Sequence, residues 1–598
     1  MKRIPEQSKN WRGIFRGNFI GDLWQTFNID LEKSLGRLRL GDKFRILTDS
    51  GDVATLGIPY KFLRTNASAT DQWWCLSSTA MLKTAGTNAF VTYAADAISG
   101  TTPVDGLDME THEDANGEQR LVVSRATDIA ILNRTGAANT WTSSWWDTTL
   151  AQDALGSAVY HPLVKLQRLL IIGDQNKIHT IDKDDVVSAS RVVLPSGFEA
   201  RCAVASSDRV WIGFQNNFGG QGVIVEWDGF SLSYNNVYNI VGSYPLTVFM
   251  VNNIPYCIDE TGYIYKFTGY GFAPDQEFPM VAEKLTFTGS TLATTATIVP
   301  HGVAVDRHLA YINVGAPTTS RRMRSGVWVY NTQNKNLTHL RGLSQHKTAG
   351  TDLAYGGTPF FRPGALKLIV DGANSVYDLL AGASVYTVYT GTTLLTIQRT
   401  VANELQASNE GRNRGYFITP FIPAGGINDY FQELWLKFRR FLNSNNRIIV
   451  YYRVLDPDRD QDNNDETVQQ VTGTWVDTTS FTAAVPTGVV VGDLVEVMAG
   501  ANSGCIEPIS TLSATPDGST SITVTLSNAV PTSSTAAFLA RFDNWVLVDT
   551  ITSTSRGNQP VNFPSNPTGE FIQLLVELRG FSNELDEMVL TSKDNQKI

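Results

Sequence analysis

Short apolar strands separated by polar turns recur along the first two thirds of the chain. In each copy an alternating apolar segment leads into a Gly-, Asn- or Asp-rich turn and then into a second apolar segment. The copies are RLVVSRATDIAIL (120–132), RLLIIGDQNKIHTI (168–181), RVWIGFQNNFGGQGVIVEW (209–227), IPYCIDETGYIYKF (254–267), HLAYINVGAPTTSRRMRSGVWVYN (308–331), LKLIVDGANSVYDLL (366–380) and, more loosely, WWCLSSTAMLKTAGTNAFVTYA (73–94). Alternation of this kind predicts β-hairpins rather than helices.

The spacing of these hairpins indicates a structural repeat. Their second strands are anchored at Phe90, Ile129, Ile178, Val223, Ile264, Val327 and Val376. Most intervals between anchors are about 39 to 49 residues, the period of propeller blades. One interval of 63 residues contains two insertions, at 288–297 and 317–325.

Each repeat has room for four strands. In the fourth, EARCAVAS, RVWIGF and GVIVEW are followed by the turn Asp228-Gly229 and then by FSLSYN, which we read as the fourth strand. Four antiparallel strands per unit and seven units predict a seven-bladed β-propeller. Stacked β-sandwiches with accidental spacing are the alternative.

The two ends of the chain differ from the repeats. Residues 1–57 are predicted to form an extended arm, or else a short strand that closes the ring, before a propeller at 58–400. Alternating strands at 401–472 and 542–598 predict a C-terminal β-sandwich, and residues 473–541 predict a small β-barrel inserted into it. The expected fold class is therefore all-β: a seven-bladed β-propeller followed by a β-sandwich with an inserted small β-barrel.

Composition and charge narrow the choice of partners. Of the 598 residues 18% are charged and 10% aromatic, and the formal net charge is −10. An acidic chain lacks the basic patch of Lys and Arg residues that binds nucleic-acid phosphates, although it could line a channel through which DNA slides. Four widely spaced cysteines form no disulfide framework and suit a reducing cytoplasm. We expect no signal peptide and no membrane span.

Patterns that would indicate catalysis or metal binding are weak. The sequence has no P-loop, no HExxH, no GxSxG and no CxxC motif. His339 and His346 lie close enough in sequence to suggest a pair, but no further residues follow at the spacing of metal ligands. The acidic run 456–466 alternates like a calcium loop, but its sixth and twelfth positions are Gln461 and Thr467, where an EF-hand needs Gly and Glu. We therefore expect no cofactor, no metal and no enzymatic activity.

Two groups of residues are candidates for an interface. Trp141, Trp145 and Trp146 could stack on sugars or anchor a partner, although packing between blades is the favoured interpretation, as it is for Trp73-Trp74. Arg321, Arg322 and Arg324 occupy the inserted turn of the sixth unit. They could contact an acidic partner or DNA phosphate, or could simply be solvated.

Three parts of the sequence resemble tailed-bacteriophage virion proteins. They are the arm FNIDLEKSLGRLRLGDKFRILTDS (27–50), the series GYFITPFI, WLKFRRF and IIVYYRV with its return at FIQLLVELRG, and the segment VGDLVEVMAGANSG (491–504). Among these, the chain is most similar in architecture to the tail nozzle, or tail tubular protein B, family of short-tailed phages. The resemblance implies a six-fold ring below the adaptor or portal, with the DNA exit channel along its axis. It implies no catalytic residue.

The expected function is structural: a nozzle or tail-tube ring that extends the DNA channel and offers a platform for fibres. The expected partners are copies of itself in a cyclic ring, adaptor or portal-side proteins, tail fibres, and DNA that passes without specific binding. The expected location is the virion tail, after assembly in the host cytoplasm. A glycan-binding tail protein and a propeller glycosidase are the alternatives, although glycoside cleavage needs two facing carboxylates that no spacing singles out.

Overall fold

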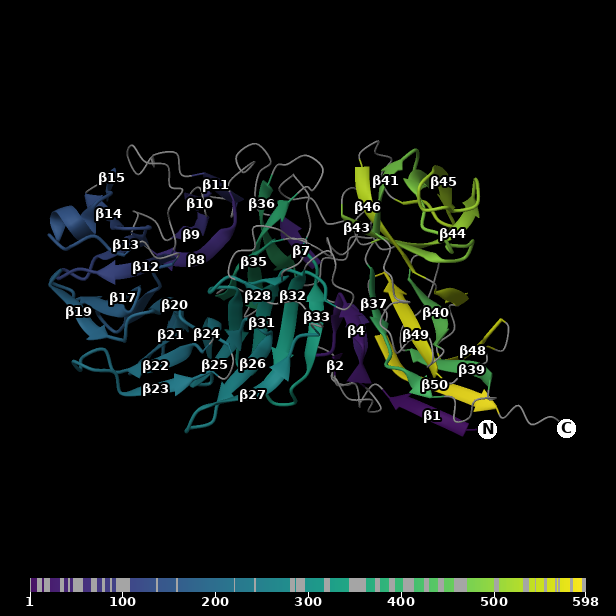
Figure 1. Cartoon of the computed structure of the whole chain (residues 1–598), viewed down its shortest axis with the longest axis horizontal. Helices are drawn as coiled ribbons and strands as arrows, with labels where there is room; N and C mark the ends of the chain where they lie inside the picture. Colours follow the sequence, from purple (N-terminus) through teal and green to yellow (C-terminus); the bar gives the residue numbers. More distant parts are fainter. Residues whose placement is uncertain are drawn as a thin grey trace.

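The computed structural model is built almost entirely of β-strands (Figure 1). It describes residues 2–7, 13–14, 22–32, 37–40, 43–46, 57–65, 72–77, 81–85, 89–92, 108–135, 138–156, 160–219, 221–240, 243–279, 285–286, 296–316, 323–343, 362–370, 377–386, 393–401, 414–423, 430–438, 446–455, 470–499, 505–530, 537–543, 545–552, 557–564, 567, 571–580 and 584–593.

Four-stranded antiparallel sheets follow one another along the chain, each with its strands in sequence order. The first two are β8 (Pro59–Thr65), β9 (Gln72–Ser77), β10 (Met81–Ala85), β11 (Ala89–Thr92), and β12 (Asp108–Glu113), β13 (Gln119–Ser124), β14 (Ile129–Thr135), β15 (Ala138–Thr142). The third and fourth are β16 (Leu163–Leu166), β17 (Leu169–Asp174), β18 (Lys177–Ile181), β19 (Val187–Val193), and β20 (Phe198–Ala205), β21 (Val210–Asn216), β22 (Val223–Trp227), β23 (Asn236–Asn239). The fifth is β24 (Pro245–Val251), β25 (Ile254–Asp259), β26 (Tyr263–Phe267), β27 (Phe272–Glu277).

Two further sheets complete the series. One consists of β30 (Val303–Asp306), β31 (Leu309–Val314), β32 (Gly326–Asn331) and β33 (Leu337–Arg341), extended by β2 (Gly13–Ile14) and β3 (Asp22–Leu23). The other consists of β34 (Arg362–Val370), β35 (Tyr377–Tyr386), β36 (Thr393–Val401) and β7 (Lys43–Ile46). A two-stranded parallel pair, β28 (Leu285–Thr286) and β29 (Ala296–Thr297), lies at the borders of the first predicted insertion, 288–297.

The first strands of these sheets contact one another in a closed cycle. The order of contacts is β8, β12, β16, β20, β24, β30, β34 and back to β8. Apolar clusters fill the spaces between successive sheets, as where Ile171 and Ile178 pack with Ile212 and Phe214. We call this assembly the sheet ring. Its strands hydrogen-bond within each sheet, whereas the sheets associate through side-chain burial.

The described parts of the N-terminal segment are distributed among several sheets. β7 pairs antiparallel with β36, so a strand from the start of the chain completes the last sheet. β1 (Lys2–Gln7) pairs with β50, and β4 (Gln25–Phe27) pairs with β37. The described parts of 1–57 therefore fit the strand that closes the ring rather than the extended arm.

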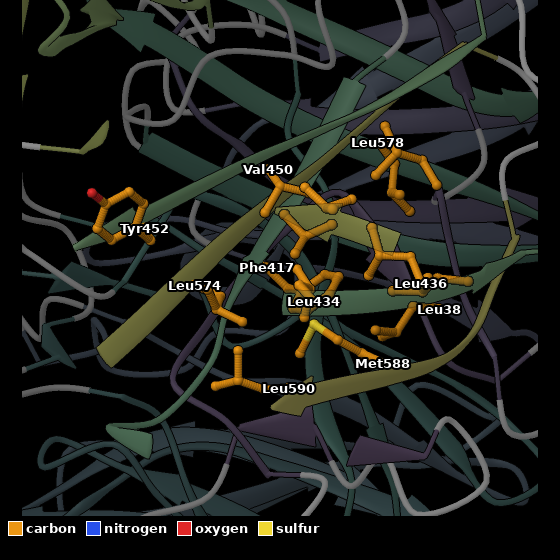
Figure 2. Close-up of a cluster of buried hydrophobic side chains, with 14 of the residues drawn as sticks. Leu38, Phe417, Leu434, Leu436, Val450, Tyr452, Leu574, Leu578, Met588 and Leu590 are labelled. Carbon is orange, nitrogen blue, oxygen red and sulfur yellow. The ribbon is translucent and has the colours of Figure 1, made fainter. Parts of the chain in front are cut away.

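Two sheets near the C-terminus share one apolar core (Figure 2). One is β48 (Gly557–Asn562), β39 (Tyr430–Phe438), β50 (Glu584–Lys593), β6 (Leu38–Leu40), β5 (Ile29–Asp30) and β1. The other is β4, β37 (Arg414–Ile418), β49 (Phe571–Arg579), β40 (Arg447–Leu455), β47 (Val546–Ile551) and β38 (Ile422–Pro423). Leu434 and Met588 from the first sheet meet Phe417, Val450 and Leu574 from the second. We call this pair the C-terminal sheets.

A closed barrel is inserted between β40 and β47. Its strands run in the order β41 (Gln470–Trp475), β42 (Ser480–Ala484), β45 (Ser521–Leu526), β44 (Ile506–Leu512), β43 (Leu494–Ala499), β46 (Ala537–Asp543). Trp475 stacks on Phe538 with ring centroids 4.4 Å apart, and Phe481 packs edge-on to both. The barrel spans 470–543, a few residues more than the predicted 473–541.

Close packing between the last and first sheets predicts a mutational effect. A Cβ added at Gly382 in β35 would lie 2.7 Å from Pro59 Cβ in β8, whereas one at Gly271 would meet nothing within 4 Å. Gly382→Ala should therefore destabilise the chain by about 1–3 kcal/mol through overpacking, and Gly271→Ala should have almost no effect. Chemical denaturation of both variants checks this. Equal midpoints would show that the last and first sheets do not pack against each other as described.

Candidate functional site

The predicted tryptophan cluster lies mostly inside the protein. Trp145 and Trp146 are buried on a single π-helical turn (Trp145–Thr149) and pack into the core between the second and third sheets. Trp146 Nε1 donates to the carbonyl of Asp153 at 2.7 Å. The Arg120 guanidinium lies over the Trp145 ring. Trp141 is half-buried against a neighbouring cluster.

This burial corrects the sugar-stacking interpretation for Trp145 and Trp146. Aromatic faces must be exposed to bind a glycan, and here they fill the space between two sheets. The favoured alternative, packing between sheets, describes their position.

The predicted basic tip is also corrected. Arg324 is 2% exposed, and its Nη2 lies 3.1 Å from Glu496 Oε2 of the barrel. It therefore joins the sheet ring to the barrel inside one chain and is not a solvated loop residue. Arg321 and Arg322 lie outside the described residues.

Of the histidine and acidic residues considered for a metal site, the structure describes His339. His339 is buried, accepting a hydrogen bond from the Asn28 N–H at Nδ1 while Nε2 lies 2.9 Å from the Ser325 carbonyl. Burial lowers the pKa of His339 to about 3. His346 and the acidic run 456–466 lie outside the described residues. Within the described ranges, no group of three or more His, Cys, Asp or Glu side chains could hold a metal ion.

A buried polar cluster occupies the axis of the sheet ring. The Asp108 carboxylate, at the start of β12, accepts hydrogen bonds from Tyr160 Oη at 2.9 Å and from the Leu163 N–H at 2.8 Å. It also lies 2.9 Å from His301 Nε2 and 3.0 Å from Lys61 Nζ. These partners come from β8, from the start of the third sheet and from the segment before β30. We call the four side chains of Lys61, Asp108, Tyr160 and His301 the axial cluster.

The charges of the axial cluster are fixed by its contacts. Burial alone would raise the pKa of Asp108, but His301 and Lys61 hold it well below its ordinary value. Burial would lower the pKa of Lys61, but Asp108 and Glu110 raise it. Burial also lowers the pKa of His301. Asp108 is therefore an anion paired with the Lys61 cation, and its contact with His301 joins the second sheet to the segment that precedes β30.

A second buried charge network ties the barrel to the C-terminal sheets. Glu507 Oε1, on barrel strand β44, lies 3.0 Å from both Arg414 Nη2 and Arg579 Nη2. Arg579 Nε also lies 2.7 Å from Glu577 Oε1. All four side chains are at most 4% exposed, and we call them the junction network. Arg414 and Arg579 hold the pKa of Glu507 below its ordinary value although burial opposes this.

The most exposed apolar surface lies on the fourth and fifth sheets. Leu232 is 78% exposed, Tyr270 is 96% exposed, and Phe230 and Tyr234 accompany them. These residues occupy the β22–β23 and β26–β27 connections, which lie at the lower left of Figure 1, away from β39 to β50. Beneath them the Phe267 ring lies 5.0 Å from those of Trp211 and Tyr238. We call Phe230, Leu232, Tyr234 and Tyr270 the aromatic face.

The β22–β23 connection holds its apolar side chains outward in an ordered turn. The Asp228 carboxylate accepts hydrogen bonds from the N–H groups of Phe230 and Ser231, both at 2.8 Å, and from Ser231 Oγ at 2.5 Å. These bonds lower the pKa of Asp228 to about 2, against the opposing effect of burial. Trp227 Nε1 donates to the Ser231 carbonyl. Because the turn is fixed in advance, little entropy would be lost when a partner binds.

Sequence reasoning missed this surface because FSLSYN alternates like a strand. In the structure 230–235 is a connection, and the fourth strand is Asn236–Asn239. The signal that distinguishes the two is the Asp228-Gly229 turn itself, since Asp caps the following N–H groups and Gly229 adopts φ +84°.

Comparisons with known proteins give only distant likenesses. No protein-family model matches the chain, and no curated protein matches it. Raptor from Chaetomium thermophilum is similar with 10% identity and a TM-score of 0.35 over 61% of this chain, which spans only 30% of Raptor. BamB from Moraxella catarrhalis has 13% identity and a TM-score of 0.28, covering 58% of this chain and 98% of BamB. The N-terminal domain of Nup159 has 9% identity and a TM-score of 0.34, covering 60% and 96%.

These three neighbours are propeller-like proteins. In the described part of the chain, no helix has the length and apolar character needed to cross a bilayer.

Proposed function

We propose that this chain is a structural protein of a tailed-bacteriophage particle, a nozzle or tail-tube ring component that extends the DNA exit channel. The observation that carries the proposal is the way buried charge joins the parts of the chain. The axial cluster, the Arg324–Glu496 pair and the junction network connect sheets distant in sequence into one body. A body joined in this way suits a structural protein, whose role depends on its shape and not on a chemical reaction.

The sheet ring is, in this proposal, a seven-bladed β-propeller, and the C-terminal sheets are a β-sandwich. The closed cycle of first strands from β8 to β34 supports the propeller, as does completion of the last sheet by β7. Joining the two ends of a propeller within one sheet resists opening of the ring. The shared core of Figure 2 supports the sandwich.

The channel would run between copies of the chain and not through one propeller. Asp108, Lys61 and His301 fill the axis of the sheet ring at one level, which leaves no open path there for a duplex. A cyclic assembly needs a heterologous interface, in which two different surfaces of the chain meet. The net charge of −10 would keep DNA mobile in such a channel.

The aromatic face supports docking to another copy, an adaptor protein or a fibre. Exposed large apolar residues that are rigidly held are typical of interfaces. The same face favours the second candidate, a glycan-binding tail protein, because Phe230, Tyr234 and Tyr270 offer aromatic rings to solvent.

Leu232→Ser combined with Phe230→Ser should leave folding almost unchanged, within about 0.5 kcal/mol, because both side chains are solvent-exposed. Ring assembly, measured by sedimentation velocity, should weaken at least tenfold because two apolar contacts are lost. Val490→Ser, an exposed apolar change on the barrel, is the matched control. Unchanged assembly with loss of binding to host-surface polysaccharide would instead establish the second candidate.

A further inference from the structure

The outer surface of the barrel carries a buried charge stripe where it meets the other parts. Glu496 on β43 lies directly opposite Arg541 on β46. Their neighbours Val495, Val497 and Ala540 belong to the barrel core, so alternation along the strands turns Glu496 and Arg541 outward. Further along the same outer face, Met498 and Leu539 pack against the core of the fifth and sixth sheets.

The only acidic side chain opposite Arg541 in this register is already engaged. Glu496 Oε2 lies 3.1 Å from Arg324 Nη2, and Glu496 Oε1 accepts a hydrogen bond from Tyr416 Oη at 3.3 Å. Tyr416 Oη in turn accepts a hydrogen bond from Gln25 Nε2 at 3.0 Å. Two guanidinium groups therefore share a single carboxylate.

Two of the three guanidinium nitrogens of Arg541 lack a hydrogen-bond acceptor in the part of the chain that the structure describes. Arg541 is only 7% exposed, and among the described residues its Nε and Nη1 atoms have no hydrogen-bond partner. Asp543 lies two residues further on the same face, but its Oδ2 accepts a hydrogen bond from Trp545 Nε1, and its Oδ1 lies 3.5 Å from Arg453 Nη1. Burial, and next the Arg324 cation, lower the pKa of Arg541, although Asp543 and Glu496 oppose this.

A buried guanidinium without acceptors is strongly unfavourable. The free energy needed to remove its charge from water is far larger than the stabilisation that one ordinary hydrogen bond provides. The two unpartnered atoms, Nε and Nη1, lie on opposite edges of the guanidinium, and each forms with Nη2 one of the forks that bind carboxylate and phosphate oxygens in a bidentate manner. Because only 7% of Arg541 is exposed, the guanidinium is out of reach of a polymer. The missing partner is therefore small and anionic.

We propose that Arg541 binds a small free oxyanion of the inorganic phosphate class at the junction of the barrel, the sheet ring and the C-terminal sheets. Arg324 contributes the second positive charge, and Glu496 fixes the spacing of the two cations. The bound ion neutralises the surplus charge and strengthens the contact between the barrel and the sheet ring. This inference does not depend on the proposed function.

Thermal unfolding of the full chain in inorganic phosphate, compared with sodium chloride at equal ionic strength, tests the proposal. Wild-type protein should gain roughly 2–3 °C in Tm at phosphate concentrations far above Kd. Arg541→Met should lose this gain and should be at least as stable as wild type in phosphate-free buffer, because an uncompensated buried charge has been removed.

Arg201→Met is the matched control. Arg201 on β20 is a partly buried arginine that is satisfied, because its Nε donates to Gln215 Oε1 at 2.8 Å and its Nη2 lies 3.2 Å from Glu199 Oε2. This variant should lower the Tm and keep the phosphate gain. A wild-type Tm that phosphate does not raise, an Arg541→Met variant that keeps the gain, or one that is strongly destabilised without phosphate would each overturn the proposal.

Discussion

Replacing Glu507 with glutamine should destabilise the barrel and the C-terminal sheets by about 3–5 kcal/mol, the usual cost of leaving buried charges without their partner. Glu507 lies 3.0 Å from both Arg414 and Arg579 and is almost fully buried, so its loss removes the carboxylate that the two guanidinium groups share. Hydrogen exchange, read strand by strand, should show faster opening of β44 and β49. Protection of β16 to β27 should stay unchanged because those strands lie in other clusters.

Asp184→Asn provides the matched control. Asp184 pairs with Lys183 at 2.8 Å, but both side chains are at least 40% exposed. A surface pair of this kind contributes about 0–1 kcal/mol. Equal losses for the two variants would show that the junction network does not join the barrel to the C-terminal sheets.

Asp108→Asn should destabilise the sheet ring by a similar amount, about 3–5 kcal/mol, because it leaves the buried Lys61 cation without its closest anion. Its pH dependence provides a further test. The folded pKa of Asp108 lies below its ordinary value, so its stabilising contribution is complete above the unfolded pKa of about 4 and is lost as pH falls towards the folded value.

Acid titration of stability should therefore separate the two proteins. Wild type should lose ring stability below about pH 4, whereas Asp108→Asn should lack this component of the loss. Asp153→Asn, at an exposed position near the second sheet, is the control and should titrate like wild type. An Asp108→Asn variant with the acid sensitivity of wild type would contradict the charge assignment of the axial cluster.

The repeat was predictable because it rests on local patterns. Hairpins such as 168–181 and 254–267 are the second and third strands of their sheets, β17–β18 and β25–β26. The last unit was shifted, since 366–380 falls on β34 and β35, the first and second strands. A hairpin of the first and second strands and one of the second and third strands both consist of two apolar segments around a polar turn. The sequence pattern therefore did not distinguish between them.

Long-range partners were not predictable from the pattern. Residues 43–46 could equally be an arm or an edge strand until their pairing with β36 is known. Arg324 follows two other arginines and therefore suggested an exposed basic tip, but its partner Glu496 lies 172 residues away. For Trp145 and Trp146 the sequence favoured packing over sugar binding, and their burial agrees with packing.

The most direct test of the central claim, that the chain is a rigid ring-forming part of a phage tail, is cryo-electron microscopy of the virion whose genome encodes it. We predict several copies around the tail axis in a closed ring. In each copy the sheet ring, the barrel and the C-terminal sheets should keep their relative positions, and the aromatic face should be covered by a neighbouring chain. A chain absent from the virion, or present as a single copy off the tail axis with that face exposed, would contradict the account.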